Sequence, residues 1–375
     1  MIRVAVIGCG KIADAHATAI EHMAEARIVA ACDLELLMAQ QFAERYAVES
    51  TYDDVGAMLE RVSPDVVHIT TPPQSHFPLA KQCLEANVSV YVEKPFTVTA
   101  REAEDLIALA ERMNLRLTAG HDLQFSPVSC RLRDLVEEGY LGGPPVHMES
   151  YYCYDLGNAE YARALLTDRE HWVRTLPGGL LQNIISHGVA RLAEFLTCDD
   201  PEVYAYGFVS QSLTELGETG LVDELRVIIR DRSGITAYFT FSSQMRPCYR
   251  LFRIFGSKNG AELDEDKQLL IRIPGGAFKS YAEMFLPPLL RMLENLRNLV
   301  RNLRGFMKGG LHTKQGMMNL IEKFYLSLDG KAEPPISHRE ILLTARIMEV
   351  IFQQVASQDR DKVGFNSTSG TDKAL

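Results

Sequence analysis

The sequence lacks the features of membrane-spanning, disulfide-bonded and nucleic-acid-binding proteins. None of its apolar runs approaches the ~18 residues of a transmembrane helix. Its seven cysteines are scattered, odd in number and without a C-x-x-C pair, so we expect reduced buried thiols and no metal site. Lysine and arginine total 39 against 49 acidic residues, and the net charge of −10 argues against nucleic acid as a partner.

Length and composition indicate a globular protein of two domains. At 375 residues the chain exceeds one ordinary domain, and 46% hydrophobic with 23% charged residues is a globular composition. Met1 leads straight into an apolar strand and leaves no room for a signal peptide, so we expect a cytoplasmic location.

The first 33 residues have the pattern of a dinucleotide-binding unit. After the apolar strand 4–7, the G-x-G-x-x-A turn consists of Gly8, Cys9, Gly10, Lys11, Ile12 and Ala13. Gly8 permits the tight turn, Gly10 admits a pyrophosphate close to the backbone, and Ala13 allows close helix packing. The helix expected over 12–23 then presents its N-terminal N–H groups to the phosphates. The alternative is a turn with a structural role only.

Asp33 ends the second expected strand, 27–32, about twenty residues after the turn. A carboxylate at this position accepts hydrogen bonds from both ribose hydroxyls of an adenosine. A 2′-phosphate would meet its negative charge, and no Arg or Ser immediately follows. We therefore expect NAD, with NADP the less favoured cofactor.

Helices and strands are expected to alternate up to residue 122, and β-rich stretches follow. Strands expected at 66–69, 88–92 and 115–119 predict an α/β fold, with a doubly wound parallel Rossmann sheet over 1–122. Residues 123–357 predict a second, α+β domain with a largely antiparallel sheet and with late helices at 289–304, 315–328 and 337–357. The polar residues 358–375 are expected to be disordered.

Two clusters contain residues suited to catalysis. Lys94 follows the strand 88–92 between Glu93 and Pro95, where its ammonium group can hold a substrate hydroxyl near a nicotinamide. The alternative is a loop lysine paired with Glu93. In the second cluster Gly178 and Gly179 open an expected helix that carries His187 one turn after Asn183. His187 suits proton transfer, and the alternative is a histidine that packs or caps the helix.

Taken together, these stretches resemble the glucose-fructose oxidoreductase / inositol dehydrogenase family (Gfo/Idh/MocA). The resemblance implies Lys94 as the catalytic lysine and His187 as the catalytic acid/base. It implies cofactor contacts from residues 8–13, Asp33, Thr70, Thr71, Pro72, Pro73, His76, Glu93 and Lys94. It implies that residues 123–357 form the substrate-binding and oligomerisation domain, with an open sheet through which a homodimer or homotetramer forms. It implies substrate contacts from Lys94, His121, Gln124, Trp172, Arg174, Asn183 and His187.

Two positions depart from the common family pattern. Asn183 stands where an aspartate is usual, and Gln124 stands where an arginine is frequent. An amide cannot raise the basicity of a neighbouring imidazole by charge, so inositol and glucose are doubtful substrates. The segments 154–157, 171–172 and 176–187 resemble a subgroup associated with bacterial surface polysaccharides, which suggests a sugar or nucleotide-sugar substrate.

Three functional hypotheses follow from these residues. The first is an NAD-dependent oxidoreductase that oxidises a ring hydroxyl, or reduces a ring ketone, of a sugar, sugar derivative or nucleotide-sugar. The second is an enzyme that retains NAD and cleaves its substrate through transient oxidation. The third is a non-redox regulatory protein that binds NAD and a sugar.

The segment 289–308 combines an apolar stripe with five cations and one acid, a local charge of +4 (five minus one). One interpretation is a helix whose apolar stripe packs on the domain, with arginines at its rim. The other is peripheral contact with an anion or a membrane surface.

Overall fold

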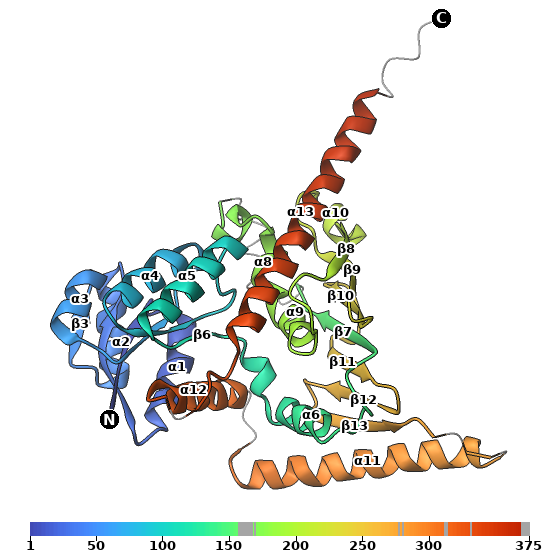
Figure 1. Ribbon diagram of the computed structural model, residues 1–375. Helices are drawn as coiled ribbons and strands as arrows, with labels where there is room; N and C mark the ends of the chain where they lie inside the picture. Colours follow the sequence, from blue (N-terminus) through green and yellow to red (C-terminus); the bar gives the residue numbers. More distant parts are fainter. Residues whose placement is uncertain are drawn as a thin grey trace, which may run out of the picture. The chain divides into compact units, whose positions relative to one another are not determined.

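The computed structural model describes residues 1–156, 168, 170–276, 278–279, 281–310, 314–330 and 332–368. The chain forms two compact units. The first consists of Met1–Arg133 and Leu296–Ala345, and the second consists of Asp134–Asn295 and the chain from Arg346 onward. Figure 1 shows their helices and strands, and each unit is described separately below.

The first unit contains a six-stranded parallel sheet in the order β3-β2-β1-β4-β5-β6. Its strands are β1 (Ile2–Ile7), β2 (Ala26–Cys32), β3 (Ser50–Tyr52), β4 (Val66–Ile69), β5 (Ser89–Val92) and β6 (Leu117–Ala119). Side chains of β1, β4 and β5 are almost wholly buried, as expected for strands covered on both faces. The predicted doubly wound Rossmann sheet is therefore confirmed.

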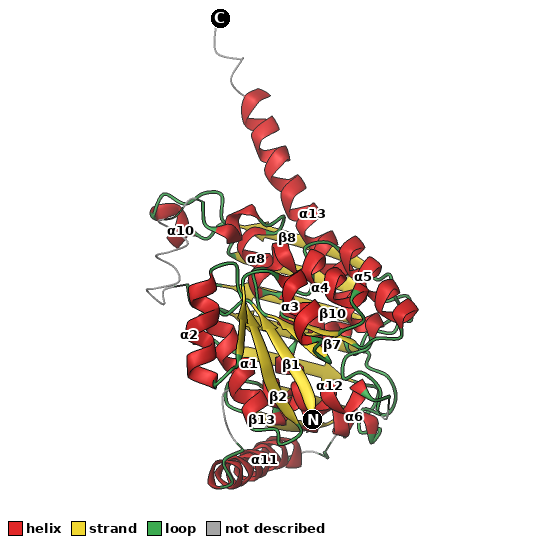
Figure 2. Ribbon diagram, turned by 90° about the vertical axis from the view of Figure 1, so that its left-hand side faces the viewer, coloured by secondary structure: helices red, strands yellow, loops and turns green. Residues whose placement is uncertain are grey.

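Helices flank both faces of this sheet (Figure 2). They are α1 (Lys11–Glu21), α2 (Leu36–Tyr46), α3 (Val55–Val62), α4 (His76–Glu85) and α5 (Ala100–Met113), with short 3-10 turns at Pro73–Ser75 and Asp122–Phe125. Thr99 begins α5 with a complete capping box, since its side chain accepts from the Glu102 N–H and Glu102 accepts from the Thr99 N–H. The chain then enters α6 (Pro127–Glu137).

β1 lies between β2 and β4, so the order of strands reverses at this point. The connections from β1 and from β4 leave in opposite directions, which opens a crevice beyond the carboxyl ends of these two strands. The glycine turn follows β1 and the loop 70–76 follows β4. Both loops therefore border the place where doubly wound sheets bind their ligands.

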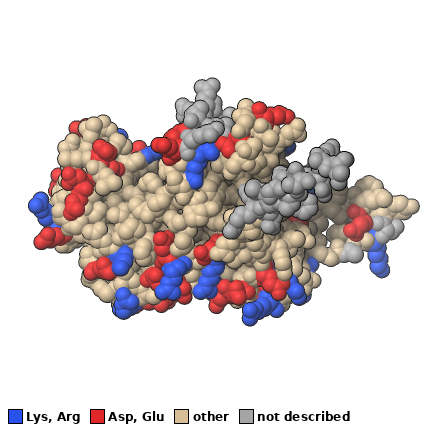
Figure 3. All heavy atoms as spheres, turned by 90° about the horizontal axis from the view of Figure 1, so that it is seen from above, with Lys and Arg blue, Asp and Glu red and all other residues tan. Residues whose placement is uncertain are grey.

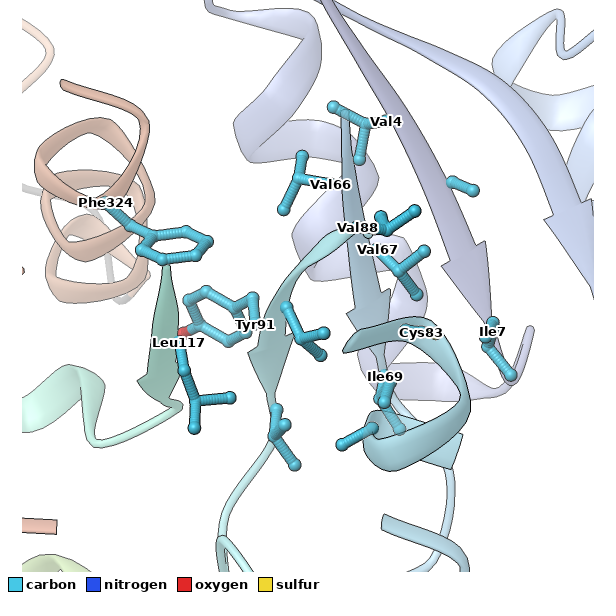
Figure 4. Packing of buried hydrophobic residues seen from close by; sticks show 14 of the residues in the cluster. Val4, Ile7, Val66, Val67, Ile69, Cys83, Val88, Tyr91, Leu117 and Phe324 are labelled. Carbon is cyan, nitrogen blue, oxygen red and sulfur yellow. The ribbon is translucent and has the colours of Figure 1, made fainter. Parts of the chain in front are cut away.

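A late segment of the chain completes the core of the first unit. α12 (Gln315–Leu328) contributes the buried side chains of Leu320, Ile321 and Phe324 to the same cluster as Tyr91 of β5. Figure 4 shows Phe324 turned toward Tyr91, and their ring centroids lie 6.0 Å apart. We expected residues 123–357 to form one continuous domain. The structure instead assigns Leu296–Ala345 to the first unit, because the apolar face of α12 packs there.

The second unit contains a seven-stranded sheet in the order β13-β12-β11-β7-β10-β9-β8. Its strands are β7 (His147–Cys153), β8 (Glu202–Phe208), β9 (Glu224–Arg230), β10 (Thr236–Ser242), β11 (Arg250–Phe255), β12 (Asn259–Asp264) and β13 (Leu269–Pro274). β7 and β10 are parallel, and the other neighbouring pairs are antiparallel. The predicted mostly antiparallel sheet is confirmed. Buried and exposed residues alternate along β8 and β9, so one face of the sheet is open.

The remaining helices differ from the sequence-based expectations in their bounds. The helix expected from Gly178 to His187 is two short helices, α8 (Gly179–Ile184) and α9 (Ser186–Ala193), after a 3-10 turn at Trp172–Thr175. α10 (Gln211–Glu215) follows β8. α11 (Ala282–Met307) begins before the expected residue 289 and includes Pro287 and Pro288.

α13 (His338–Thr368) continues beyond residue 357, where we expected structure to end. The first part of the predicted disordered tail is therefore helical, and residues 369–375 lie outside the described residues.

Candidate active site

The glycine turn has the geometry that a bound pyrophosphate requires. Gly8 has φ +90°, and a Cβ there would lie 2.5 Å from Cγ2 of Thr71, so a side chain is excluded by both conformation and space. A Cβ at Gly10 would meet no atom of the described residues within 4 Å. The backbone beside the first turn of α1 is thus open to a ligand, and the residues present fit a dinucleotide.

The Asp33 carboxylate is held at the end of β2 by two backbone groups. Its Oδ2 accepts from the Cys9 N–H at 2.7 Å, and its Oδ1 accepts from the Glu35 N–H at 3.0 Å. The Cys9 N–H is therefore committed to Asp33. Burial, followed by the charge of Asp33, raises the pKa of the Cys9 thiol to about 12, which makes Cys9 a packing residue of the turn.

The loop after β4 is fastened to the glycine turn and to the loop after β5. The Thr70 hydroxyl lies 3.0 Å from the Ile7 carbonyl and 2.5 Å from the Gly8 carbonyl, both acceptors. The His76 ring lies between two backbone carbonyls, with Nδ1 2.9 Å from Pro95 O and Nε2 2.8 Å from Thr71 O. These contacts give His76 a structural role as a link between two loops, and its expected contact with the cofactor stays a prediction.

Glu93 and Lys94 lie at the carboxyl end of β5. Glu93 is buried, and its Oε2 accepts from the Lys94 N–H at 3.0 Å. Burial lowers the pKa of the half-buried Lys94 ammonium group, while the charges of Glu93 and Asp122 oppose this shift. Burial acts to raise the pKa of Glu93, but the hydrogen bond from His16 and the charges of His16 and Lys94 outweigh it and lower that pKa. Glu93 is therefore an anion that fixes the backbone of Lys94.

A chain of buried hydrogen bonds extends from Glu93 into the core. His16 of α1 places Nε2 2.9 Å from Glu93 Oε1 and Nδ1 2.8 Å from Nδ1 of His68. His68 of β4 places its Nε2 2.9 Å from the Tyr325 hydroxyl of α12. His68 also stacks on Tyr91, with ring centroids 4.8 Å apart. One helix, two neighbouring strands and α12 therefore meet in one polar network.

An ionised Glu93 only accepts, so His16 donates to it from Nε2. Burial, with a smaller contribution from His16, lowers the pKa of His68 well below its usual value, so the His68 ring is neutral. A neutral ring has one donor and one acceptor nitrogen, so His68 donates to one of its two neighbours, His16 and Tyr325, and accepts from the other.

His121 and Gln124 follow β6, the strand beside β5. His121 is buried, and burial lowers its pKa to about 4, so the ring is neutral near pH 7. Gly120 lies against Glu93, because a Cβ there would be 2.9 Å from Glu93 Oε1. Gln124 is buried, and its backbone carbonyl accepts from the Arg133 guanidinium at 3.3 Å. The structure thus brings His121 to the same sheet edge as Lys94.

In the second unit, α9 packs closely on the sheet and presents His187. A Cβ at Gly188 would lie 2.4 Å from Phe239 of β10, so only glycine allows this contact. The half-buried His187 ring stacks on Tyr152 of β7, with centroids 6.4 Å apart and an interplanar angle of 20°. Asn183 lies on α8 and His187 on α9, and the two short helices are joined at Ile185.

The other expected substrate contacts in this unit have internal partners. Arg174 donates to Glu218 at 2.7 Å. Burial alone would raise the pKa of Glu218, but hydrogen bonds from Arg174 and backbone N–H groups lower it. Trp172 stacks on His171, with centroids 5.7 Å apart. Their roles toward a substrate stay predictions.

Three comparisons relate this chain to known proteins. The family model of the Gfo/Idh/MocA oxidoreductases, with an NAD-binding Rossmann fold, matches residues 2–121. D-glucoside 3-dehydrogenase of Escherichia coli is 36% identical over 142 residues, which cover 38% of this chain and 40% of that protein. Myo-inositol 2-dehydrogenase of Thermotoga maritima is 23% identical over 327 residues, or 85% of this chain and 93% of that protein. The WlbA dehydrogenase of Bordetella pertussis, solved in complex with NADH and UDP-GlcNAcA, is 17% identical with a TM-score of 0.75 over 95% of this chain and 96% of that chain.

The parallel sheet, the glycine turn at its switch point and the acid after β2 define an NAD-binding Rossmann protein. The family model of the Gfo/Idh/MocA oxidoreductases matches this first unit over residues 2–121, so that part of the chain has the NAD-binding Rossmann fold of the family. It is an NAD-dependent oxidoreductase. The stretch shared with the Escherichia coli enzyme spans 40% of that protein, and the solved structure at 17% identity shows a common fold.

Sequence reasoning missed His16, His68 and Tyr325 as parts of the site. His16 lies on the buried face of α1 with Ala13, Ala17 and Ile20, and this periodicity marks it as buried. His68 interrupts an otherwise apolar strand, which is a weaker signal. No sequence pattern joins either residue to Tyr325, which is more than 250 positions away.

Replacing the Asp33 carboxylate is expected to weaken NAD binding. Asp33→Ser removes a charged acceptor for ribose hydroxyls, so the Kd for NAD should rise roughly 10–100-fold and the preference over NADP should shrink. Calorimetric titration with NAD and NADP measures both effects. Asp53→Ser, at an exposed carboxylate nearby, is the control. Unchanged NAD affinity in the Asp33 variant would contradict the assignment.

Glu93→Gln is expected to lower the free energy of unfolding by about 1–3 kcal/mol near pH 7, because the amide cannot accept from both Lys94 and His16. The lowered pKa of Glu93 means that its contribution is complete above its ordinary pKa of 4.5 and is lost as pH falls through the lowered value. Urea unfolding at neutral and acidic pH should show the difference from the unaltered protein shrinking in acid. The exposed Glu60→Gln serves as the control, and a pH-independent difference would refute the role of the charge.

Proposed function

We propose that this protein oxidises a ring hydroxyl, or reduces a ring ketone, of a sugar, sugar derivative or nucleotide-sugar. The observation that supports it most is the position of Lys94 at the carboxyl edge of the NAD-binding sheet. Its backbone is held by the buried Glu93 carboxylate, and its pKa is lowered by burial. The backbone of Lys94 is thus held in one position, and its lowered pKa makes its ammonium group a better proton donor than that of an exposed lysine.

The remaining roles are proposed from residue chemistry. NAD, when bound, supplies the hydride acceptor or donor. Lys94 donates a hydrogen bond to the substrate oxygen and orients the carbon that loses or gains hydride. His187 takes the hydroxyl proton during oxidation and returns it during reduction. Stacking on Tyr152 restricts the ring to one plane, which favours a defined direction of transfer.

The substrate class is supported by the names of similar proteins. The relatives include dehydrogenases of a glucoside and of myo-inositol, and the WlbA dehydrogenase was solved with UDP-GlcNAcA. Asn183 replaces the usual aspartate, so we place a sugar derivative or nucleotide-sugar of surface-polysaccharide biosynthesis before inositol. We also propose a cytoplasmic location, which the seven free cysteines support.

Turnover should depend on Lys94 and His187 while NAD binding does not. Each of Lys94→Ala and His187→Ala is expected to reduce kcat about 10²–10⁴-fold with little change in NAD affinity. Nicotinamide absorbance against inositols, free sugars and UDP-sugars identifies the substrate, and mass spectrometry of the denatured protein identifies any retained dinucleotide. The exposed residues Lys81→Ala and His22→Ala serve as controls.

Each outcome of this experiment separates the hypotheses. Full turnover in either active-site variant would overturn the assigned roles. The retained-NAD enzyme would be favoured if denaturation frees NAD from the protein and the native protein forms product without a net change in nicotinamide absorbance. NAD and sugar binding without any product from the unaltered protein would favour the regulatory protein.

We further propose a homodimer or homotetramer formed through the open face of the second sheet. Tyr204, Tyr206, Ile228 and Tyr238 project from β8, β9 and β10, with exposed fractions between 47% and 61%. An apolar aromatic face of this kind is typical of a protein interface. Light scattering should therefore give a mass of two or four chains, and Tyr206→Glu should lower it. A monomeric unaltered protein would contradict this proposal.

A further inference from the structure

α11 turns its polar side inward and its apolar side outward. Glu294 and Asn298, one turn apart, are 6% and 0% exposed. The apolar residues on the opposite side of the helix have exposed fractions between 47% and 73%; they include Phe285, Leu289, Leu296, Leu299, Leu303 and Phe306. At 100° per residue these six positions fall on one face, away from Glu294. This arrangement is the reverse of an ordinary amphipathic surface helix.

Polar contacts explain why the helix packs in this orientation. Glu294 accepts from Arg272 of β13 at 2.7 Å, and Arg291 donates to Glu262 of β12 at 2.7 Å. Figure 1 shows α11 as one long helix beside β13. We considered an apolar stripe packed against the domain, with arginines at its rim, and the structure shows this interpretation to be wrong. The ion pairs fasten the polar side, and the apolar stripe is left on the surface.

The charge of the helix contrasts with that of the whole protein. Arg291, Arg297, Arg301, Arg304 and Lys308 give the segment 289–308 a charge of +4, whereas the chain carries −10. On the face drawn in Figure 3, acidic and basic side chains are intermixed. Arg297 and Arg304 are exposed and lie at the margin of the apolar stripe, since they are seven residues, or about two turns, apart.

We propose that α11 binds an anionic lipid bilayer and lies in its surface. Phe, Leu and Met side chains enter the boundary between head groups and acyl chains, and the flanking arginines contact lipid phosphates. None of the described helices is long and apolar enough to cross a bilayer, so the helix is placed along the surface. A second copy is the less favourable occupant, because two such helices face to face would bring their arginines together. This inference is independent of the proposed reaction.

Vesicle co-sedimentation of the full-length protein tests the proposal. The unaltered protein should sediment with phosphatidylcholine vesicles that contain phosphatidylglycerol, and should stay in solution with phosphatidylcholine alone. Binding should fall as salt rises, because salt screens the arginines. Leu296→Gln, Leu299→Gln and Leu303→Gln together should lower the bound fraction about tenfold or more. Leu326→Gln is a matched control, since Leu326 is 57% exposed on α12.

A second variant tests the charge. Arg297→Gln, Arg304→Gln and Lys308→Gln together should remove the dependence on phosphatidylglycerol, with Arg101→Gln as the exposed control. The proposal is overturned if the unaltered protein does not sediment with anionic vesicles, or if the leucine variant sediments as well as the unaltered protein. A fall in mass by light scattering in the leucine variant, without vesicle binding by the unaltered protein, would assign the face to a second copy. Unchanged thermal unfolding and NAD binding would show that the variants are folded.

Discussion

The geometry of the candidate site depends on one buried carboxylate. Glu93 lies at the end of a core strand, and burying an unpaired charge there would cost several kcal/mol. His16 from α1 and the backbone N–H of Lys94 satisfy its two oxygens. The same hydrogen bonds that make the buried charge tolerable also determine where Lys94 leaves the strand. Stability and the position of the proposed catalytic lysine therefore have one physical cause.

The network behind Glu93 connects parts of the chain that are far apart in sequence. His68 of β4 and Tyr325 of α12 extend it across the core, and both are buried. Each ring nitrogen of His16 and His68, and the Tyr325 hydroxyl, has a hydrogen-bond partner inside the network, so no polar atom of these three side chains is buried without one. A polar network that is fully satisfied holds its members more rigidly than apolar packing does. It also explains why α12 belongs to the Rossmann unit.

The two units hold different candidate residues. In the first, Lys94 and His121 lie at the carboxyl edge of the parallel sheet, which has the glycine turn at its switch point. In the second, His187 lies on a helix that Gly188 allows to pack against β10. In the same chain α11 combines ion-paired contacts on its inner side with an apolar outer side. An NAD-binding Rossmann chain thus carries, on a separate helix, an exposed apolar stripe flanked by arginines.

The sequence by itself determined the Rossmann unit and its NAD cofactor, because glycine spacing, strand length and a terminal acid are local properties of the chain. It also located the turn at Gly8 and the helix 315–328. Tertiary structure decided what depends on contacts between distant residues. These include the pairing of Glu93 with His16, the place of α12 in the first unit, and the outward face of α11. Periodicity showed that α11 has an apolar stripe, but the ion pairs of Glu294 and Arg291 decided which way it faces.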